Sequence, residues 1–438
     1  MVIFITLVAI IVVAFFVLSR KEKSPNTQNN GLNTSIIDDK NIKIVHVTDI
    51  HYLSPSLTDY GKSFVDTIEK SDGKMMRYID QIMDAFVLEM IRTKPDLVIV
   101  SGDMTYNGEK ESHIGLANKF KILKDKGIKV LVLPGNHDLE NEMALAFEGD
   151  ATRPVETVTI EEFEEIYKGY GYGKDDPDVV SRDKKSLNYV YQLGNKCHLI
   201  MVETSTKGND QTISNSSYRW IEKWLRKAKD MNMRVIGVSH QNILAHNKLF
   251  IAGYKITNSS RLVDLYNKYN VRINLSGHMH IQHMAEHKRV HDIALACLGL
   301  YPNLYGVLDM DLRNNMTYHT ESLDVAYWMK KYKHQDSDLL DFENTSREYF
   351  VRCTRLQTEK QLAKLDLSKE DKEMMMDFMV DTNIHYFSGS LDKRPDLSLD
   401  NPAYKLWMDH CERTFTGSYL NSIYTDTISD HNRLEIFQ

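Results

Sequence analysis

The chain has 438 residues, of which 42% are hydrophobic and 26% are charged, and its formal net charge at pH 7 is -7. This length allows one large domain plus a smaller one, and the composition is typical of a globular protein. The acidic balance argues against a general nucleic-acid-binding protein, which usually carries a basic excess. The four cysteines are far apart and form no CxxC pair, so neither a disulfide scaffold nor a structural zinc site is indicated.

The amino terminus carries an uncharged apolar run over residues 2–18, and three basic residues follow within residues 20–23. A run of this length is at the lower limit for a membrane span, and no small-residue cleavage site follows it. We therefore expect an uncleaved membrane anchor over 1–20, rather than a removed signal peptide, and a flexible linker over 21–41. The expected location is the cell membrane with the main body of the protein outside the cytoplasm, although the basic flank alone favours a cytoplasmic position.

An alternation of strands and helices follows the linker. Three apolar runs predict buried strands at 42–48, 96–101 and 129–134. Between them, apolar residues at helical spacing predict helices over 78–92 and 109–126. This order predicts right-handed crossovers and a parallel sheet, whose functional groups gather beyond the carboxyl ends of its strands.

Further strands and helices are predicted after a long insertion over 139–188. The strands are expected at 189–193, 198–203, 234–239, 271–276, 291–297, 305–312 and 316–323. Helices are expected at 217–231 and 260–269, and a short helix is expected at 160–167 within the insertion. Because the last three strands have no helices between them, we expect them to form antiparallel pairs that complete a second sheet against the first.

Helical patterns dominate from residue 324 onward. They cover the segments 327–332, 339–355, 360–365, 368–382 and 404–414. Ser368 and Asp371 resemble a helix-start pair. We therefore predict two domains after the linker, an α/β domain over 42–323 and a mostly helical C-terminal cap domain over 324–438.

Polar side chains that can bind a metal follow the predicted strands at their carboxyl ends. They are Asp49, His51, Asp103, Asn136, His240, His278 and His280. A single strand-end histidine is more often a packed residue than a ligand, but such groups after so many strands indicate a common site. Carboxylate, amide and imidazole ligands without a thiolate favour two divalent ions such as manganese, iron or zinc. One shared carboxylate would hold two ions about 3.5–4 Å apart, a separation suited to in-line displacement at phosphorus.

In chain order these residues spell D-x-H, G-D, G-N-H-D, H and G-H-x-H. Over residues 42 to about 323 the sequence resembles the calcineurin-like metallophosphoesterase superfamily, which implies a four-layer αββα sandwich. The resemblance assigns one metal ion to Asp49, His51, Asp103 and His280, and the other to Asp103, Asn136, His240 and His278. It implies that His137 faces the scissile phosphate and stabilises or protonates the leaving oxygen, with Asp138 as its orienting partner.

The surrounding residues narrow the subgroup. The second motif continues as Gly102-Asp103-Met104-Thr105-Tyr106-Asn107-Gly108, without the GDxxDRG pattern of protein serine/threonine phosphatases. The residues after Asp138 also differ from the GNHEFD form of nucleotidases. The nearest likeness is to bacterial cyclic-nucleotide phosphodiesterase-like members, through segments 48–55, 101–110 and 134–138 and the helical C-terminal part.

Together these features predict a metal-dependent phosphodiesterase that acts on a small phosphodiester such as a cyclic nucleotide, by in-line attack of a hydroxide that bridges the two metal ions. One alternative is a phosphomonoesterase, or a phosphohydrolase of cell-envelope phospholipid or teichoic-acid linkages, on the same site. A third hypothesis is an inactive surface binding module on an old hydrolase fold, although every ligand position carries a competent residue. The sequence does not identify the substrate-binding residues; Tyr52, Tyr60 and Asn107 are candidates without a distinctive pattern.

Overall fold

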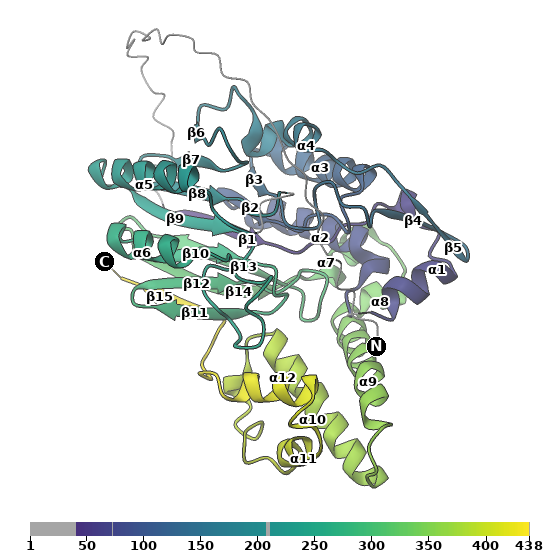
Figure 1. The fold of residues 1–438 in the computed structure, drawn as a ribbon. Helices are drawn as coiled ribbons and strands as arrows, with labels where there is room; N and C mark the ends of the chain where they lie inside the picture. The colour runs from purple at the N-terminus through teal and green to yellow at the C-terminus, as the bar shows by residue number, and fades with distance from the viewer. Residues whose placement is uncertain (1–40, 72, 207–210, 438) are drawn as a thin grey trace, which may run out of the picture. The chain divides into compact units, whose positions relative to one another are not determined.

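The computed structural model describes residues 41–71, 73–206 and 211–437, and Figure 1 shows its elements. Six strands form the first sheet, in the spatial order β15, β14, β13, β1, β2, β3. Their bounds are β1 Ile42–Val47, β2 Leu97–Ser101, β3 Lys129–Leu133, β13 Leu304–Met310, β14 Met316–Ser322 and β15 Arg433–Ile436. As predicted, β1, β2 and β3 are parallel, and α2 (Ile79–Thr93) and α3 (Lys110–Asp125) connect them.

Seven strands form the second sheet, in the spatial order β11, β12, β10, β9, β8, β7, β6. Their bounds are β6 Val179–Arg182, β7 Tyr189–Leu193, β8 Cys197–Val202, β9 Arg234–Ser239, β10 Ile273–Ser276, β11 His283–His287 and β12 Val290–Ala294. Strands β8, β9, β10 and β12 are parallel. Helix α5 (Asn215–Asp230) leads from β8 to β9, and α6 (Ser260–Tyr269) leads from β9 to β10.

The predicted grouping of the late strands is wrong for two of the three. β13 pairs antiparallel with β1, and β14 pairs with β13, so both belong to the first sheet. Only β12 joins the second sheet, where it lies parallel to β10. Without β13, the apolar strand β1 would be an edge with unpaired backbone groups, and the order of residues does not show which sheet offers such an edge. Strand β11 was not predicted, because its sequence lacks regular alternation.

Shorter elements lie in the connections. They are α1 Lys62–Phe64, α4 Ile160–Ile166, the hairpin of β4 Leu145–Glu148 and β5 Ala151–Pro154, and helical turns at Pro55–Leu57, Val65–Glu69, Met76–Tyr78, Lys168–Tyr172 and Leu391–Lys393. Helix α4 begins with a capping box, in which Thr159 and Glu162 bind each other's backbone N–H groups.

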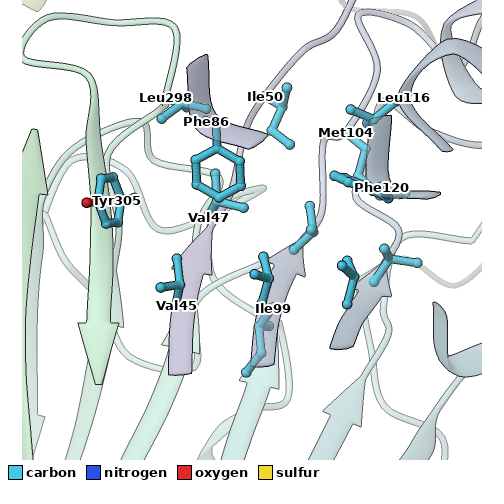
Figure 2. Close-up of a cluster of buried hydrophobic side chains, with 14 of the residues drawn as sticks. Val45, Val47, Ile50, Phe86, Ile99, Met104, Leu116, Phe120, Leu298 and Tyr305 are labelled. Carbon is cyan, nitrogen blue, oxygen red and sulfur yellow. The ribbon is translucent and has the colours of Figure 1, made fainter. Parts of the chain in front are cut away.

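The main hydrophobic core joins the two sheets and the helices that cover the first one. Ile99 of β2, Leu275 of β10 and Phe86 of α2 belong to one buried cluster. Figure 2 shows part of this cluster, with Phe86 of α2 and Phe120 of α3 beside strands of the first sheet. A second cluster packs Trp224 of α5 and its neighbours against the second sheet. The sheets are therefore fixed against each other, and so are the strand ends that carry the polar residues.

Helices dominate the segment after β14. They are α7 Val325–Tyr332, α8 Ser337–Leu340, α9 Phe342–Leu362, α10 Lys369–Phe387, α11 Pro402–Cys411 and α12 Phe415–Tyr424. The predicted start of α10 is confirmed, because the Ser368 hydroxyl accepts a hydrogen bond of 3.0 Å from the Asp371 N–H. The chain then returns to the first sheet as β15, which pairs antiparallel with β14. The helical region is thus inserted between two neighbouring strands.

The predicted membrane location needs correction. Among residues 41–71, 73–206 and 211–437, no helix has the length and apolar character needed to cross a membrane. Such a span needs about 20 consecutive apolar residues. The longest helix of this part, α9, instead carries charged side chains along its length. The predicted anchor over 1–20 and most of the predicted linker over 21–41 lie outside the described residues.

The packing predicts a large cost for removing the buried ring of Phe86. A Phe86→Ala substitution should lower the free energy of unfolding by about 3–5 kcal/mol, because it leaves a cavity between α2 and the first sheet. The matched control is Ile122→Ala on the neighbouring helix α3, where the side chain is 44% exposed and the expected change is within about 0.5 kcal/mol. Urea unfolding monitored by circular dichroism measures both values. Equal losses in the two variants would contradict this account of the core.

Candidate metal centre

The seven residues predicted as metal ligands lie together at the carboxyl ends of strands from both sheets. Asp49 and His51 follow β1, Asp103 follows β2, Asn136 follows β3, His240 follows β9, and His278 and His280 follow β10. Six of them form two groups, Asp49, His51, Asp103 and His280 in one and Asp103, His240 and His278 in the other, with one ligand atom per residue within 4.8 Å of the others. Asp103 belongs to both groups, so one carboxylate borders two candidate cation positions.

The first group brings two imidazole nitrogens and two carboxylates together. The Nε2 atoms of His51 and His280 are 3.1 Å apart. Asp49 Oδ1 lies 3.3 Å from His280 Nε2, and Asp103 Oδ2 lies 3.9 Å from His51 Nε2. Asp49, His51 and Asp103 are buried, and His280 is partly exposed. This is a mixed nitrogen and oxygen donor set of the kind that manganese, iron and zinc accept.

The second group is centred on the Nε2 atom of His240. This nitrogen lies 3.3 Å from Asp103 Oδ1, 3.2 Å from His278 Nδ1 and 3.1 Å from Asn136 Oδ1. The remaining ring nitrogens bind backbone oxygens: His240 Nδ1 is 3.0 Å from the Ser101 carbonyl, and His278 Nε2 is 2.9 Å from the Gly253 carbonyl. A backbone partner on the far nitrogen orients an imidazole for metal binding through the other.

The contacts within the site suit a pair of cations. Asp49 Oδ1 is buried, and within the described part of the chain it has no hydrogen-bond partner. In each group, two imidazole nitrogens face each other at close range. When neither nitrogen carries a hydrogen, both lone pairs are left without a hydrogen-bond donor. A divalent ion among these atoms would satisfy the unpaired oxygen and the lone pairs together.

The protonation states of three of the proposed ligands favour cation binding. Burial opposes the ionised form of Asp103, but the neighbouring His240 and His137 outweigh it and hold the pKa of Asp103 well below its usual range. Burial lowers the pKa of His51 well below its usual value. Burial together with His240 lowers the pKa of His278 to about 4. Asp103 as an anion and His51 and His278 as neutral imidazoles are in the forms that bind metal ions. His240 differs: although burial lowers its pKa, the neighbouring Asp103 carboxylate raises it to about 9, so this ring must lose a proton when an ion binds.

Left-handed backbone conformations are concentrated at these ligands. The φ angles are +50° at Asp49, +49° at His51, +46° at Asp103, +68° at His278 and +57° at His280. A residue other than glycine in this region costs about 1–3 kcal/mol, and such strain persists only where the surrounding structure enforces it. In these conformations Asp49 and His51 place ligand atoms of the same group within 4.8 Å of each other.

Three glycines of the motifs allow close contacts with the ligands. A Cβ atom on Gly102 would lie 2.4 Å from the Nδ1 atom of His240. One on Gly135 would lie 2.2 Å from Asp103 Oδ1, and one on Gly277 would lie 2.4 Å from Asp49 Oδ2. These distances are impossible for non-bonded atoms, so only glycine fits at the three positions.

His137 lies at the edge of the site and is held by the loop that follows β2. Its Nδ1 atom is 2.9 Å from the Tyr106 carbonyl oxygen and 2.8 Å from Asn107 Oδ1. Both partners are acceptors, so Nδ1 carries the hydrogen and Nε2 is left for the site. The Nε2 atom lies 3.9 Å from Asp103 Oδ2, and the side chain is 35% exposed, which leaves it accessible to a substrate.

The predicted partnership of His137 with Asp138 is wrong. The buried carboxylate of Asp138 accepts hydrogen bonds from the backbone N–H groups of Gly135, Met104 and Thr105, at 2.8, 3.2 and 2.9 Å. Asp138 therefore ties the loop after β3 to the loop after β2 and does not touch the imidazole. Asn107 takes the orienting role; the sequence marks it only as a loop amide, because its contact depends on the path of the loop rather than on spacing.

Comparison with protein-family models agrees with this architecture. A model described as calcineurin-like phosphoesterase matches residues 42–282, which is more than half of the chain. A second model, described as the C-terminal domain of cyclic nucleotide phosphodiesterase, matches residues 324–430. The fold is an α/β metallophosphoesterase fold with a helical C-terminal region, and the chain is a metal-dependent phosphohydrolase. It belongs to the calcineurin-like phosphoesterase family.

Individual relatives are more distant. A probable glycerophosphodiester phosphodiesterase GpdQ of Arcobacter nitrofigilis is 24% identical over 300 residues, which cover 66% of this chain and 89% of the relative. A probable cyclic nucleotide phosphodiesterase of Xenorhabdus bovienii is 23% identical over 255 residues, which cover 57% and 83% of the two chains. Among solved structures, a dimetal phosphatase from Danio rerio is 11% identical, with a TM-score of 0.45 over 64% of this chain and 96% of that one.

The shared position of Asp103 predicts a loss of both bound ions when its charge is removed. After dialysis against Mn²⁺, an Asp103→Asn variant should retain almost no metal, whereas a His278→Ala variant should keep the ion of the first group. The control is Asp309→Asn, an exposed carboxylate on β13 that should retain the full content. Elemental analysis of the protein gives the metal content, and circular dichroism checks the fold. A folded Asp103→Asn protein with the full complement of metal would contradict the shared-ligand model.

Proposed function

We propose that this protein is a phosphodiesterase that hydrolyses a small phosphodiester of the cyclic-nucleotide type at a site for two divalent ions. The observation that carries the proposal is the position of Asp103 within both candidate ligand groups. The phosphodiesterase names of two relatives and the match of the helical region to the C-terminal domain of cyclic nucleotide phosphodiesterase support the diester substrate. We further propose that the two ions are manganese, iron or zinc.

The proposed architecture is the four-layer αββα sandwich over 42–323, followed by the helical domain over 324–438. The two packed sheets and their outer helices support the first part. The family-model match that begins at residue 324 supports the boundary. Strand β15 is an exception, because it lies in the second segment and pairs within the first sheet.

The proposed ligand sets are those that the resemblance implies. One ion would be held by Asp49, His51, Asp103 and His280, and the other by Asp103, Asn136, His240 and His278. When bound, the ions would withdraw charge from the phosphoryl oxygens and lower the pKa of water that attacks phosphorus. The protein itself contributes the fixed positions of these side chains, which the left-handed backbone and the close-packed glycines enforce.

His137 is the proposed acid and electrostatic partner for the leaving oxygen. Its Nδ1–H donates to the Tyr106 carbonyl and Asn107 Oδ1, so a proton added to the ring occupies Nε2, the atom that remains for the site. In that form Nε2–H donates a hydrogen bond to the oxygen on which charge develops as the ester bond breaks, and transfers the proton to it. Asp138 contributes indirectly by holding the two loops together.

This role for Asn107 predicts a loss of rate without a loss of metal. An Asn107→Leu variant removes the side-chain acceptor from His137 Nδ1, so kcat should fall by about 10- to 100-fold while elemental analysis shows an unchanged metal content. The matched control is Asn107→Asp, which keeps an acceptor in place. It should retain most of the rate, with a pH–rate profile shifted to higher pH because a carboxylate stabilises the imidazolium. Equal activity of the Leu variant and the unmodified protein would show that this contact does not orient the ring.

Substrate preference tests the reaction class directly. The metal-loaded enzyme should hydrolyse bis(p-nitrophenyl) phosphate at least about tenfold more efficiently than p-nitrophenyl phosphate, a difference of about 1.4 kcal/mol in the activation free energy. A metal chelator should abolish both activities, and Mn²⁺ should restore them. A strong preference for the monoester would instead identify a phosphomonoesterase. If neither substrate is hydrolysed with manganese, iron or zinc, the remaining hypothesis is an inactive binding module.

A further inference from the structure

A cavity of about 270 Å³ lies between the loop that follows β9 and the C-terminal helices. One wall consists of Phe250 and Tyr254 from the loop, with Met279 from the turn after β10. The other wall comes from α9, α10 and α12, through side chains that include Asn383 and Phe415. Neither part of the chain forms the cavity alone, so the helical domain gives this face of the enzyme a binding site that the α/β domain lacks.

The cavity adjoins the candidate metal centre. Met279 stands in the sequence between the proposed ligands His278 and His280. The ring of Tyr254 lies 5.3 Å from the ring of His278, centroid to centroid, and the carbonyl of Gly253 binds His278 Nε2 at 2.9 Å. The same short loop therefore orients a metal ligand and lines the cavity.

Hydrogen bonds and apolar packing fix the two walls of the cavity relative to each other. Gln282 follows this turn, and its N–H donates to the Phe387 carbonyl at the end of α10, at 3.0 Å. Its side-chain amide donates to the His431 carbonyl at 2.6 Å. Ile281 is buried in the same apolar cluster as Met379 of α10. The distance between the metal centre and the helical wall is thus fixed by the fold.

The lining is aromatic and uncharged. The ring of Phe250 lies 5.2 Å from that of Tyr254, 6.1 Å from that of Phe415 and 6.3 Å from that of Tyr419. Phe415 is 65% exposed, so its ring is accessible to a ligand in the cavity. Of the described residues that line the cavity, none is an acid, a lysine, an arginine or a histidine. Such a surface suits a neutral, planar group that stacks on aromatic rings, and does not suit the phosphate itself.

Two side-chain amides add hydrogen-bond donors to this wall. Asn383 Oδ1 accepts from the Tyr419 hydroxyl at 2.8 Å, and Gln361 Oε1 accepts from the Thr416 hydroxyl. Within the described chain, neither amide nitrogen has a hydrogen-bond partner. With their oxygens engaged, both residues offer N–H groups, which match the acceptor nitrogens and carbonyls on the edge of a heterocyclic base.

We propose that this cavity binds the heterocyclic base of the substrate, while the phosphodiester lies at the metal centre. The inference rests on the proposed diesterase function for its substrate, but base binding can be measured separately. It assigns specificity to the helical domain together with the loop after β9: Phe415 of α12 and Phe250 of the loop contact the base, and Asn383 and Gln361 bind its edge. The α/β domain carries the reacting groups.

The first test measures binding without catalysis. Adenosine, which has no phosphate, is titrated into full-length, metal-depleted protein and followed by saturation-transfer NMR. It should bind the unmodified protein, and Phe415→Ala and Asn383→Leu should weaken binding by about tenfold or more. The matched control is Phe437→Ala, which removes an equally exposed ring, 67% against 65%, outside the cavity and should leave binding unchanged. Absence of adenosine binding, or equal binding by all variants, would overturn the inference.

The second test measures turnover with and without a base. In Phe415→Ala and Asn383→Leu, the KM for 3′,5′-cyclic AMP should rise by about tenfold. Hydrolysis of glycerophosphoethanolamine, a diester without a base, should remain unchanged. Equal effects on both substrates would overturn the base site and leave the diesterase function in place. Conversely, adenosine binding that depends on Phe415, without turnover of any diester, would support the cavity and remove the proposed reaction.

Discussion

The contact between Asp103 and His240 is the point on which the rest of the site depends. Asp103 follows β2 in the first sheet and His240 follows β9 in the second, and their side chains meet at 3.3 Å. A buried carboxylate is costly unless positive charge or hydrogen bonds compensate for it. Here the His137 N–H and the surrounding imidazoles provide part of that compensation, and a metal ion would provide the rest. The packing of the two sheets and the chemistry of the site therefore both depend on Asp103.

Much of this arrangement can be predicted from the sequence because each proposed ligand directly follows a recognisable apolar strand. The apolar runs that became β1, β2 and β3 end in Asp49, Asp103 and Asn136, and parallel strands place their carboxyl ends at one edge. The family resemblance assigns metal binding to the same residues that follow the predicted strands. The left-handed conformations at the ligands, by contrast, cannot be predicted from the sequence pattern. Aspartate and histidine adopt this region more often than most residues other than glycine, but tertiary contacts decide at which positions they do so.

Two of the errors arise from contacts that the local sequence pattern does not show, and a third arises from a weak local pattern. β13 was placed in the wrong sheet because pairing with β1 depends on which edge is vacant, not on the local pattern. The family resemblance implies Asp138 as the orienting partner of His137, whereas Asn107 makes this contact across the loop after β2. Helix α12 was not predicted, although Thr414 caps it through a hydrogen bond from the Gly417 N–H. A short segment that begins Phe-Thr-Gly lacks the strong helix formers that make such a pattern visible.

The return of the chain to the first sheet as β15 has a mechanical consequence. The helical region leaves the first sheet after β14 and returns to it as β15, so two covalent connections join the helical region to the sheet. A single linker permits twisting about itself, whereas two attachment points restrict relative motion to rotation about the line between them. Cleavage after β14 would also strip a strand from the sheet and expose a new edge, which promotes association between molecules. The helical region is thus held stiffly against the first sheet, and it cannot be removed without the loss of β15 from that sheet.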